Sequence, residues 1–317
     1  MAQLSSLDMI STVKQIADLP RNAYQTDFSN AVLLQLLTEE LRNKVVPFVV
    51  SLRENFYQCY VEENIVSGQS IYEISPRTVG SVLRELKAVT SNGNLVPLSQ
   101  IDLEDANFPT NNAVYSNCLY FYTDGNNIVL YPTPSNTNLI KLRQYIFPMV
   151  GDFKEYATLS GTQLVQYDVK IVSIGTNTLG LSLVNGYGSP TLNITGKKLD
   201  IMGSASPYAF KGLDFAVSGS PTLNTGTTVV TLDKAIPSNV KVGDLVTISG
   251  ENYKAQMPYE LREMLASYVV IRIYEQLEAW DKVKALNEKI MQMKQDMGYL
   301  LKQRVQGAPK KARTRLV

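Results

Sequence analysis

The sequence predicts an α+β protein in which helices at the two ends of the chain flank β-structure in the middle. Apolar residues follow a helical period before residue 67 and again after Pro258, as in amphipathic helices. Between these regions apolar and polar residues alternate and turn residues become frequent, which is typical of short strands. With 317 residues, 44% of them hydrophobic, the chain has enough apolar material for one large domain or two to three small ones. We expect the terminal helices to form one helical bundle that carries the β modules.

The N-terminal helical part, residues 1–67, contains the clearest amphipathic stripe. In FSNAVLLQLLTEELRNKVV the valines and leucines recur at spacings of three and four. Ser29 or Asp27 is placed to cap the start of this helix. Pro47 falls inside the pattern and predicts a break or a kink. We expect helical structure through residue 66.

Residues 68–150 are predicted to form a central β-sheet module. The run QSIYEI has the β-branched and aromatic content of a strand. The segment NCLYFYTDGNNIVLYPTP has the pattern of a hairpin, with two alternating runs around Asp124-Gly125-Asn126. A further strand, LIKLRQYIF, is ended by Pro148.

Residues 151–252 are predicted to form an additional inserted domain, a small β-barrel or sandwich. They are rich in Gly, Ser, Thr and Asn and contain short alternating strands. The hexapeptide GSPTLN occurs at 188–193 and again at 219–224. This repeat indicates either a duplicated hairpin or turn chemistry that arose twice, and both explanations stay open.

The C-terminal region is predicted to contain the remaining helices of the bundle, residues 253–305, followed by an extended basic tail, residues 306–317. Pro258 suits the first turn of a helix, and Asp281 is placed to cap a second one. That second helix carries a heptad-like apolar seam, which favours packing within its own bundle over packing on a neighbouring subunit. The seam consists of Val283, Leu286, Ile290, Met293, Met297 and Leu300.

The absence of histidine excludes most catalytic designs. The chain has no histidine and two cysteines, so Ser-His and Cys-His nucleophiles and His-based zinc sites are ruled out. We expect Cys59 and Cys118 to be buried thiols rather than a redox pair. The sequence predicts neither a signal peptide nor a membrane span. We therefore expect a soluble protein, not an enzyme, that needs no metal and no other cofactor and has no membrane partner.

Positive charge is concentrated at the C-terminus. No acidic residue follows Asp296, whereas six basic residues do. Removing these six from the 30 basic residues leaves 24 against 29 acidic residues, a net charge of −5 for the rest of the chain. Such a one-sided tail is typical of a segment that docks on an acidic surface or on nucleic acid. The six residues are Lys302, Arg304, Lys310, Lys311, Arg313 and Arg315.

The stretch SIYEISPRTVGSVLREL, residues 70–86, is the strongest local candidate for a site. Ser75 is predicted to cap a single helical turn that begins at Pro76, and Gly80 to release the chain into the next strand. A helix N-terminus can bind an anion with help from Arg77, but the stretch lacks the glycine-rich cradle and Lys-Ser/Thr pair of a phosphate loop. We expect Pro76, Arg77 and Gly80 to form a structural corner or a subunit interface. Arg77 should pair with a carboxylate or carbonyl of its own or an adjacent subunit.

Acidic and aromatic clusters favour structural roles. Asp102, Glu104 and Asp105 lack the spacing and the central glycine of a calcium loop, which favours solvated loop acids. No carboxylate pair is singled out for glycoside cleavage. The aromatic residues at 56–60 and 115–122 favour packing over base stacking, because VYSNCLYFYTDG contains no Lys or Arg.

Four segments follow one another along the chain: FSNAVLLQLLTEELRNKVVPFVVSLRENFY, YEISPRTVGSVLREL, FYTDGNNIVLYPTPSNTNLIKLRQYIFPM and YELREMLASYVVIRIYEQLEAWD. In this order they resemble the head-to-tail adaptor (connector or neck) proteins of tailed bacteriophages. The resemblance covers roughly residues 25–150 and 255–300, about half of the chain, and the segment 151–252 has no counterpart in that family.

The resemblance implies a structural virion protein, made in the host bacterial cytoplasm and located in the neck between capsid and tail. Such adaptors form a homo-oligomeric ring, usually a dodecamer, beneath the portal protein. They extend the DNA channel, pass genomic DNA without sequence-specific contact, and give tail, nozzle or further neck proteins a docking platform. The resemblance places the basic tail on the portal. Two alternatives stay open: a tail or fibre component whose residues 151–252 bind a receptor or carbohydrate, and an acid-pair cell-wall hydrolase.

Overall fold

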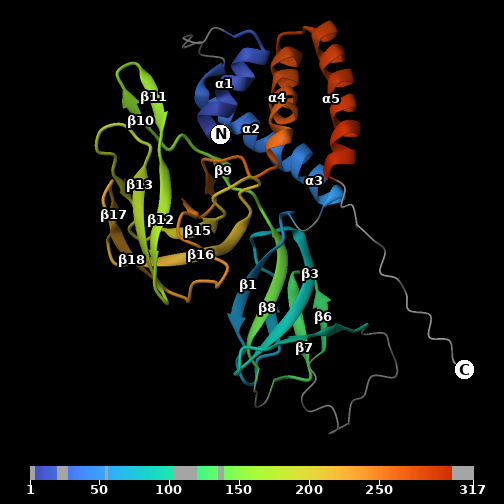
Figure 1. The fold of residues 1–317 in the computed structure, drawn as a ribbon. Coiled ribbons are helices and arrows are strands. Elements are labelled where there is room, and N and C mark those ends of the chain that lie inside the picture. The colour runs from blue at the N-terminus through green and yellow to red at the C-terminus, as the bar shows by residue number, and fades with distance from the viewer. Residues whose placement is uncertain (1–3, 20–27, 54–55, 103–119, 135–138, 302–317) are drawn as a thin grey trace, which may run out of the picture. The chain divides into compact units, whose positions relative to one another are not determined.

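The computed structural model describes residues 4–19, 28–53, 56–102, 120–134 and 139–301. The chain divides into two compact units (Figure 1). Unit 1 contains the residues up to Leu7 and Tyr57–Gln256, and unit 2 contains Asp8–Phe56 and the residues from Met257 onward. Helices and strands are both abundant, so the predicted α+β class is confirmed.

Unit 2 is helical and draws its helices from both ends of the chain. α4 packs against both α2 and α5, and it is buried along most of its length because apolar residues surround it. The Arg272 side chain on α4 donates to Glu40 of α2 at 3.2 Å. The helices are α1 (Ser6–Ile16), α2 (Asn30–Glu40), α3 (Val46–Leu52), α4 (Arg262–Gln276) and α5 (Trp280–Leu301).

The sequence signals at the helix ends are largely realised. The Ser29 side chain accepts a hydrogen bond from the amide of Val32 at 3.4 Å, which caps α2 as predicted. Asp27 lies outside the described residues. Between α2 and α3 the chain makes a π-helical turn, Leu41–Val45, directly before Pro47 in the first turn of α3. The wider turn accommodates the missing N–H of proline, so the helical run is interrupted without ending.

The C-terminal helices differ in detail from the prediction. Pro258 precedes a 3₁₀ turn, Tyr259–Leu261, that leads into α4. Asp281 lies inside the first turn of α5 rather than before it, where its charge still suits the positive end of the helix. Along the predicted seam Val283 and Ile290 are buried. α5 contacts α3 and α4, which belong to the same unit.

The prediction of helix through residue 66 is wrong for its last part. Residues Cys59–Asn64 form strand β1, which pairs antiparallel with β8 (Leu139–Pro148). The run CYVEEN has little helical propensity of its own, and the neighbouring strand offers it a full ladder of hydrogen bonds. Pairing between distant segments therefore decides the conformation.

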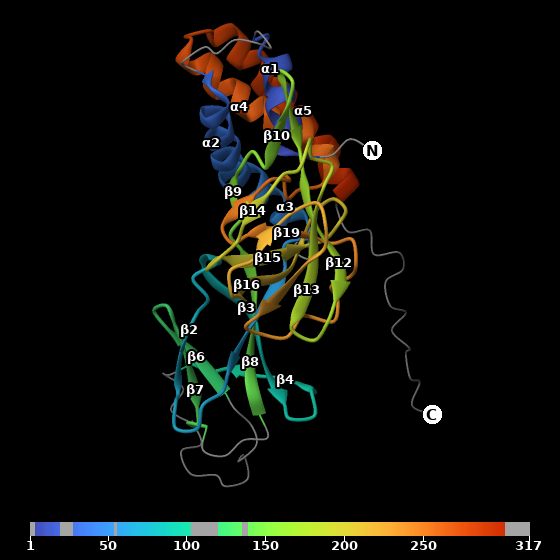
Figure 2. The same ribbon diagram turned by 90° about the vertical axis from the view of Figure 1, so that its left-hand side faces the viewer.

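The β-sheet module consists of two four-stranded sheets with the strand orders β1-β8-β3-β4 and β2-β7-β6-β5. Figure 2 shows β2, β6 and β7 beside the sheet that contains β8 and β4. Buried side chains such as Tyr72, Leu86, Phe121 and Leu142 form the core of this module. The strands are β2 (Ile71–Glu73), β3 (Thr78–Thr90), β4 (Leu95–Pro97), β5 (Ser99–Gln100), β6 (Tyr120–Asp124) and β7 (Asn127–Tyr131).

The hairpin predicted around Asp124-Gly125-Asn126 is confirmed. It joins β6 to β7, with Asp124 opposite Asn127. Gly125 has a φ of 57°, which a two-residue hairpin loop commonly requires.

The inserted region contains a closed barrel of six strands, which resolves the choice between barrel and sandwich. The strand order is β12-β13-β18-β16-β15-β19. Fully buried side chains such as Leu179, Leu181, Ile201 and Val230 fill its interior, so the barrel is a packed core rather than a channel. The strands are β12 (Asp168–Ile174), β13 (Thr178–Val184), β15 (Lys198–Met202), β16 (Phe210–Ser218), β18 (Thr228–Leu232) and β19 (Leu245–Ile248).

The two copies of GSPTLN pair with each other. They contribute β14 (Leu192–Asn193) and β17 (Thr222–Leu223), with the two leucines directly opposite. Each copy begins with a glycine at positive φ, 69° at Gly188 and 80° at Gly219. This pairing fits both a duplicated hairpin and turn chemistry that arose twice.

Two smaller pairs complete unit 1. β9 (Asp152–Phe153) runs parallel to β20 (Glu251–Asn252), where the chain enters and leaves the inserted region. β10 (Ala157–Ser160) and β11 (Gln163–Gln166) form a separate two-stranded hairpin. Of the helices that the structure describes, none combines the length and the apolarity that crossing a bilayer requires.

Candidate functional site

The predicted corner at Pro76 is a tight turn and not a turn of helix. The amide of Thr78 donates to the carbonyl of Ser75 at 2.9 Å, and β3 begins at Thr78 itself. Proline suits the second position of such a turn because its φ is already fixed. The segment therefore has no helix N-terminus at which an anion would bind.

Gly80 lies within β3 rather than before it. Its φ is 62°, and the pairing of β3 with β8 shifts register between Thr78 and Leu83. A bulge of this kind re-aims the strand, and glycine adopts the required left-handed backbone without strain. The expectation that Gly80 would release the chain into the next strand is wrong, because that strand has already begun at Thr78 and the bulge is part of it.

The Arg77 side chain joins the β-sheet module to the barrel within unit 1. Its Nη2 donates to Asp200 Oδ2 at 2.8 Å, and its Nη1 donates to Asp214 Oδ1 at 3.0 Å. The Ser249 hydroxyl accepts from Nη1 and donates to Asp214. Asp200 lies on β15 and Asp214 on β16. We call these four residues the Arg77 junction.

The electrostatics of the Arg77 junction are those of a buried charge network. The Asp200 side chain is 1% exposed, and its second oxygen accepts from the amide of Asp214 at 2.9 Å. Burial raises the pKa of Asp200, and Arg77 and the Asp214 amide oppose that rise. Burial lowers the pKa of Arg77, but its two carboxylate partners outweigh burial and raise it. Removing Arg77 would leave the Asp200 carboxylate buried without a cation, which is strongly destabilising.

The Arg77 junction is suited to joining two modules. Both carboxylates accept from one guanidinium, as in a buried ion-pair network. Ser249 contacts Asp214 and Arg77 and has no histidine or lysine base among these partners. Among the residues described by the structure, no group of three or more His, Cys, Asp or Glu side chains is arranged to hold a metal ion.

The other predicted residues are partly outside the described structure. All six basic residues that follow Asp296, together with Glu104, Asp105 and Cys118, lie in undescribed segments, and Asp102 is exposed at the edge of one. Cys59 is 5% exposed, and burial raises the pKa of its thiol to about 12. This environment is that of an inert buried thiol.

Strand pairing also builds a row of cations and aromatic rings that sequence reasoning missed. Arg143 on β8 lies over the ring of Tyr60 on β1, 4.2 Å from its centroid. Glu62 accepts from Arg143 at 2.9 Å and from Lys141 at 3.0 Å. The signal was the alternation of basic and aromatic residues in KLRQYIF, residues 141–147, which a strand places on one face.

The same row continues onto β3, where Lys87 lies 4.9 Å from the centroid of the Tyr145 ring and pairs with Glu85 at 3.1 Å. The cations thus cover the rings and are themselves paired with carboxylates. Base stacking would have to displace these contacts. The arrangement is that of cross-strand pairs that stabilise the sheet.

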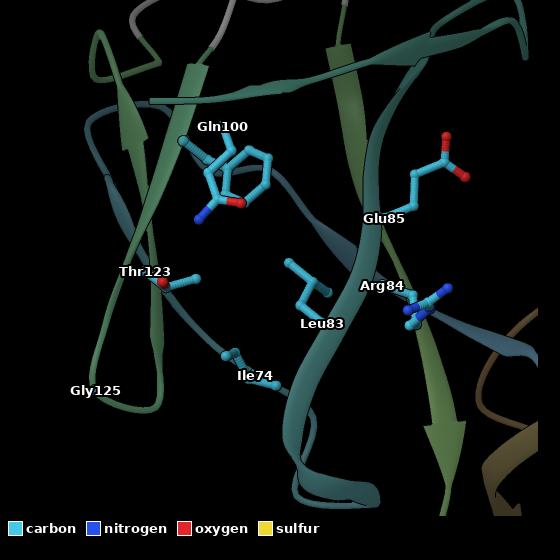
Figure 3. A pocket seen from close by; sticks show the side chains of 8 residues that line it. Ile74, Leu83, Arg84, Glu85, Gln100, Thr123 and Gly125 are labelled. Atoms are coloured by element: carbon cyan, nitrogen blue, oxygen red, sulfur yellow. The ribbon is translucent and has the colours of Figure 1, made fainter. Parts of the chain in front are cut away.

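A small pocket lies in the β-sheet module (Figure 3). Leu83 of β3 and Ile74, which directly follows β2, line it together with Gln100 of β5 and Thr123 of β6. Its volume of about 210 Å³ is below the roughly 300–1,000 Å³ that is usual for small-molecule sites. We therefore interpret it as a packing gap.

Comparison with known proteins assigns no family to the chain, because no family model matches it and no curated protein is a recognisable relative.

Proposed function

We propose that the protein is a structural head-to-tail adaptor of a tailed-phage virion, which forms a ring beneath the portal, extends the DNA channel and gives the tail a docking platform. The observation that carries this proposal is the division of the chain. Segments from both ends combine into one helical unit, and the residues between them build a separate β unit. The segments that resemble phage adaptors fall in both units, in the order that the resemblance requires.

In this proposal the helices of unit 2 form the bundle that the sequence predicts, and that bundle packs side by side around the ring. The contacts of α4 with α2 and α5 support it. A chain whose ends meet in one unit can carry insertions in its middle without disturbing that unit. The barrel is such an insertion.

The Arg77 junction supports a structural role. An adaptor has to hold its modules in fixed relation while a genome passes and a tail is attached. A buried guanidinium shared by Asp200 and Asp214 favours one relative placement of the two modules, because a displacement that separates the charges without hydrating them leaves Arg77 and Asp200 buried and unpaired.

The distribution of charge along the chain supports two parts of this proposal, the release of DNA by the channel and docking on the portal. The net charge of −5 up to Asp296 suits a channel that must release DNA, because phosphate contacts from a basic lumen would add up around a ring. The six basic residues beyond Asp296 suit docking on an acidic surface of the portal.

The test is co-assembly with a portal ring. Purified protein is mixed with purified portal rings, and the products are measured by mass photometry and negative-stain microscopy. We expect a second ring on one end of the portal. Twelve copies of a 35.2 kDa chain would add about 420 kDa.

Three results would count against the adaptor. Absence of any complex with the portal would contradict docking. A trimeric spike that binds a receptor or carbohydrate through the barrel would support the tail or fibre alternative. Turnover of peptidoglycan or polysaccharide that a single Asp or Glu substitution abolishes would support the hydrolase alternative.

A further inference from the structure

The chain contains two places where asparagine is followed by glycine, Asn92-Gly93 and Asn185-Gly186. In such a pair the backbone amide of the glycine can attack the side-chain amide of the asparagine. Glycine favours this reaction because it has no side chain to block the approach and its backbone is the most permissive. The sequence treats the two pairs alike, so their surroundings in the structure decide which of them can react.

Asn92 lies in the loop of the hairpin that joins β3 to β4 (Figure 2). The amide of Gly93 donates to the carbonyl of Thr90 at 2.8 Å, and the amide of Thr90 donates to the carbonyl of Asn94 at 2.9 Å. Gly93 has a φ of 80°. The loop is therefore a tight turn closed by a left-handed glycine, which is a common three-residue hairpin connection.

Both reacting groups of this pair are open to water. Ser91, Asn92, Gly93 and Asn94 are all exposed, and a Cβ built on Gly93 would meet nothing within 4 Å beyond its chain neighbours. Among the residues that the structure describes, none holds the side chain of Asn92. The bond from the Gly93 amide to Thr90 lies in an exposed loop tip, where local opening costs least.

Asn185 is held in place. Its side-chain amide donates to Asp168 Oδ2 at 3.1 Å, and Asp168 is 3% exposed. Attack on this amide would develop negative charge beside a buried carboxylate, which opposes the reaction. The backbone is restrained as well, because a Cβ on Gly186 would lie 3.0 Å from both Pro190 and Tyr167. The second pair is therefore protected by its packing and its ionic partner.

We propose that Asn92 is a site of spontaneous deamidation, whereas Asn185 is protected from it. The amide nitrogen of Gly93 bonds to Cγ of Asn92 while its proton passes to a base in the solvent. The Cγ–Nδ2 bond then breaks and ammonia leaves. Water opens the resulting cyclic imide at either carbonyl and leaves aspartate or isoaspartate at position 92. The reaction requires neither the ring nor the portal, so it is independent of the proposed function.

The modification changes the hairpin as well as its charge. Isoaspartate carries the main chain through the side-chain carbon, so the backbone between positions 92 and 93 becomes longer and no longer matches the tight turn. β4 is an edge strand that pairs with β3 alone in its sheet, and Val89 opposite Leu95 is its pair nearest the turn. Isoaspartate should therefore loosen β4 from this end.

The first experiment compares the two asparagines in one molecule. Full-length protein is aged at mildly alkaline pH in water labelled with heavy oxygen, once folded and once in urea. It is then digested in ordinary water, so that the label marks conversions that preceded digestion. Fragment ions in mass spectrometry assign each conversion to position 92 or 185, and isoaspartyl methyltransferase labelling distinguishes isoaspartate from aspartate.

We expect Asn92 in the folded protein to convert roughly tenfold or more faster than Asn185, because Asn185 must first give up a hydrogen bond to a charged group. In urea the difference between the two positions should become much smaller. Equal rates in the folded protein, or an Asn92 that reacts in urea alone, would overturn the proposal. The same ratio of rates in folded and unfolded protein would show that sequence sets it, and would overturn the assigned role of the structure.

The second experiment measures the effect on β4 by hydrogen exchange. Aged wild-type protein is compared with fresh Asn92→Asp, which has the added charge on an unchanged backbone, and with aged Asn92→Ser, which cannot react. We expect amides around Leu95 to exchange fastest in the aged wild-type protein. Equal exchange in all three samples would refute the loosening of β4.

Discussion

Replacing Arg77 with alanine leaves the carboxylate of Asp200 buried without its guanidinium partner. That side chain is 1% exposed, and the amide of Asp214 is a remaining donor to it. The three acceptors of Arg77 come from the barrel, namely Asp200, Asp214 and Ser249. The substitution therefore acts on the junction between the β-sheet module and the barrel.

The expected loss of unfolding free energy follows from the exposure of each partner. Removing one member of a buried ion pair costs about 3–5 kcal/mol. Arg77 is 16% exposed and Asp214 is 27% exposed, so water replaces part of the lost interaction at Asp214 but little of it at Asp200. We expect the low end of the range, about 3 kcal/mol at about pH 7.5. For a unit of this size, that corresponds to a drop in Tm of roughly 6–12 °C.

The loss should depend on pH. Burial already raises the pKa of Asp200 above its ordinary value, and Arg77 opposes that rise, so the pKa rises further in the variant. A carboxyl whose pKa is higher in the folded than in the unfolded state favours folding at low pH. That advantage is lost as the pH rises from the unfolded to the folded pKa. The destabilisation by Arg77→Ala should therefore be smaller at about pH 5 than at about pH 7.5.

Urea unfolding followed by far-UV circular dichroism at the two pH values measures these effects. The double variant Arg77→Ala with Asp200→Asn is the control, because an amide at position 200 needs no cation and still accepts from the Asp214 amide. It should recover about 1–2 kcal/mol of the loss and most of the pH dependence should vanish. A loss below about 1 kcal/mol at about pH 7.5, or equal losses at both pH values, would refute the buried network as a source of stability.

Further predictions concern single positions and the tail. Gly80→Ala should lower the free energy of unfolding by about 1 kcal/mol, because alanine is strained in the left-handed backbone at this position. The added Cβ causes no clash, since its nearest neighbour is Val82 at 3.8 Å. Gly298→Ala, in α5 with open space around the new Cβ, should instead stabilise by about 0.5–1 kcal/mol in the same urea assay. Cys59 should resist iodoacetamide at about pH 8 until urea is added, since its thiol pKa is about 12; rapid native labelling seen by mass spectrometry would contradict this. Deleting 306–317 should leave melting unchanged but abolish co-assembly with the portal, and unchanged co-assembly would exclude the tail as the docking segment.

Local sequence signals predicted those parts of the fold that local chemistry decides. The cap at Ser29 and the hairpin at Asp124-Gly125-Asn126 depend on neighbouring residues alone. The inserted barrel was foreseen because its short strands alternate. The closure of the barrel could not be predicted, because closure depends on how six strands pair across about eighty residues. Residues 59–64 were assigned to helix because their own pattern is weak, and β8 supplies the partner that makes them a strand.

The candidate site shows the same limit. The corner residues were recognised from proline, arginine and glycine in one short stretch. The partners of Arg77 lie 123 and 137 positions away, at Asp200 and Asp214, and no local pattern in the sequence points to them. They lie in the inserted region, for which the adaptor resemblance offers no counterpart, so the resemblance could not supply them either.

The short parallel pair of β9 and β20 makes the barrel a removable cassette. The amide of Asp152 donates to the carbonyl of Gly250 at 2.8 Å, and the amide of Lys154 donates to Asn252 at 2.7 Å. At Gly151 a Cβ would lie 2.8 Å from the backbone of Glu251. The segments that enter and leave the inserted region therefore pass so close to each other that glycine is required at position 151. Because the chain leaves the barrel where it entered, a few linking residues would bridge the gap if the barrel were excised or exchanged. Excision would also remove Asp200, Asp214 and Ser249, the three acceptors of the Arg77 side chain.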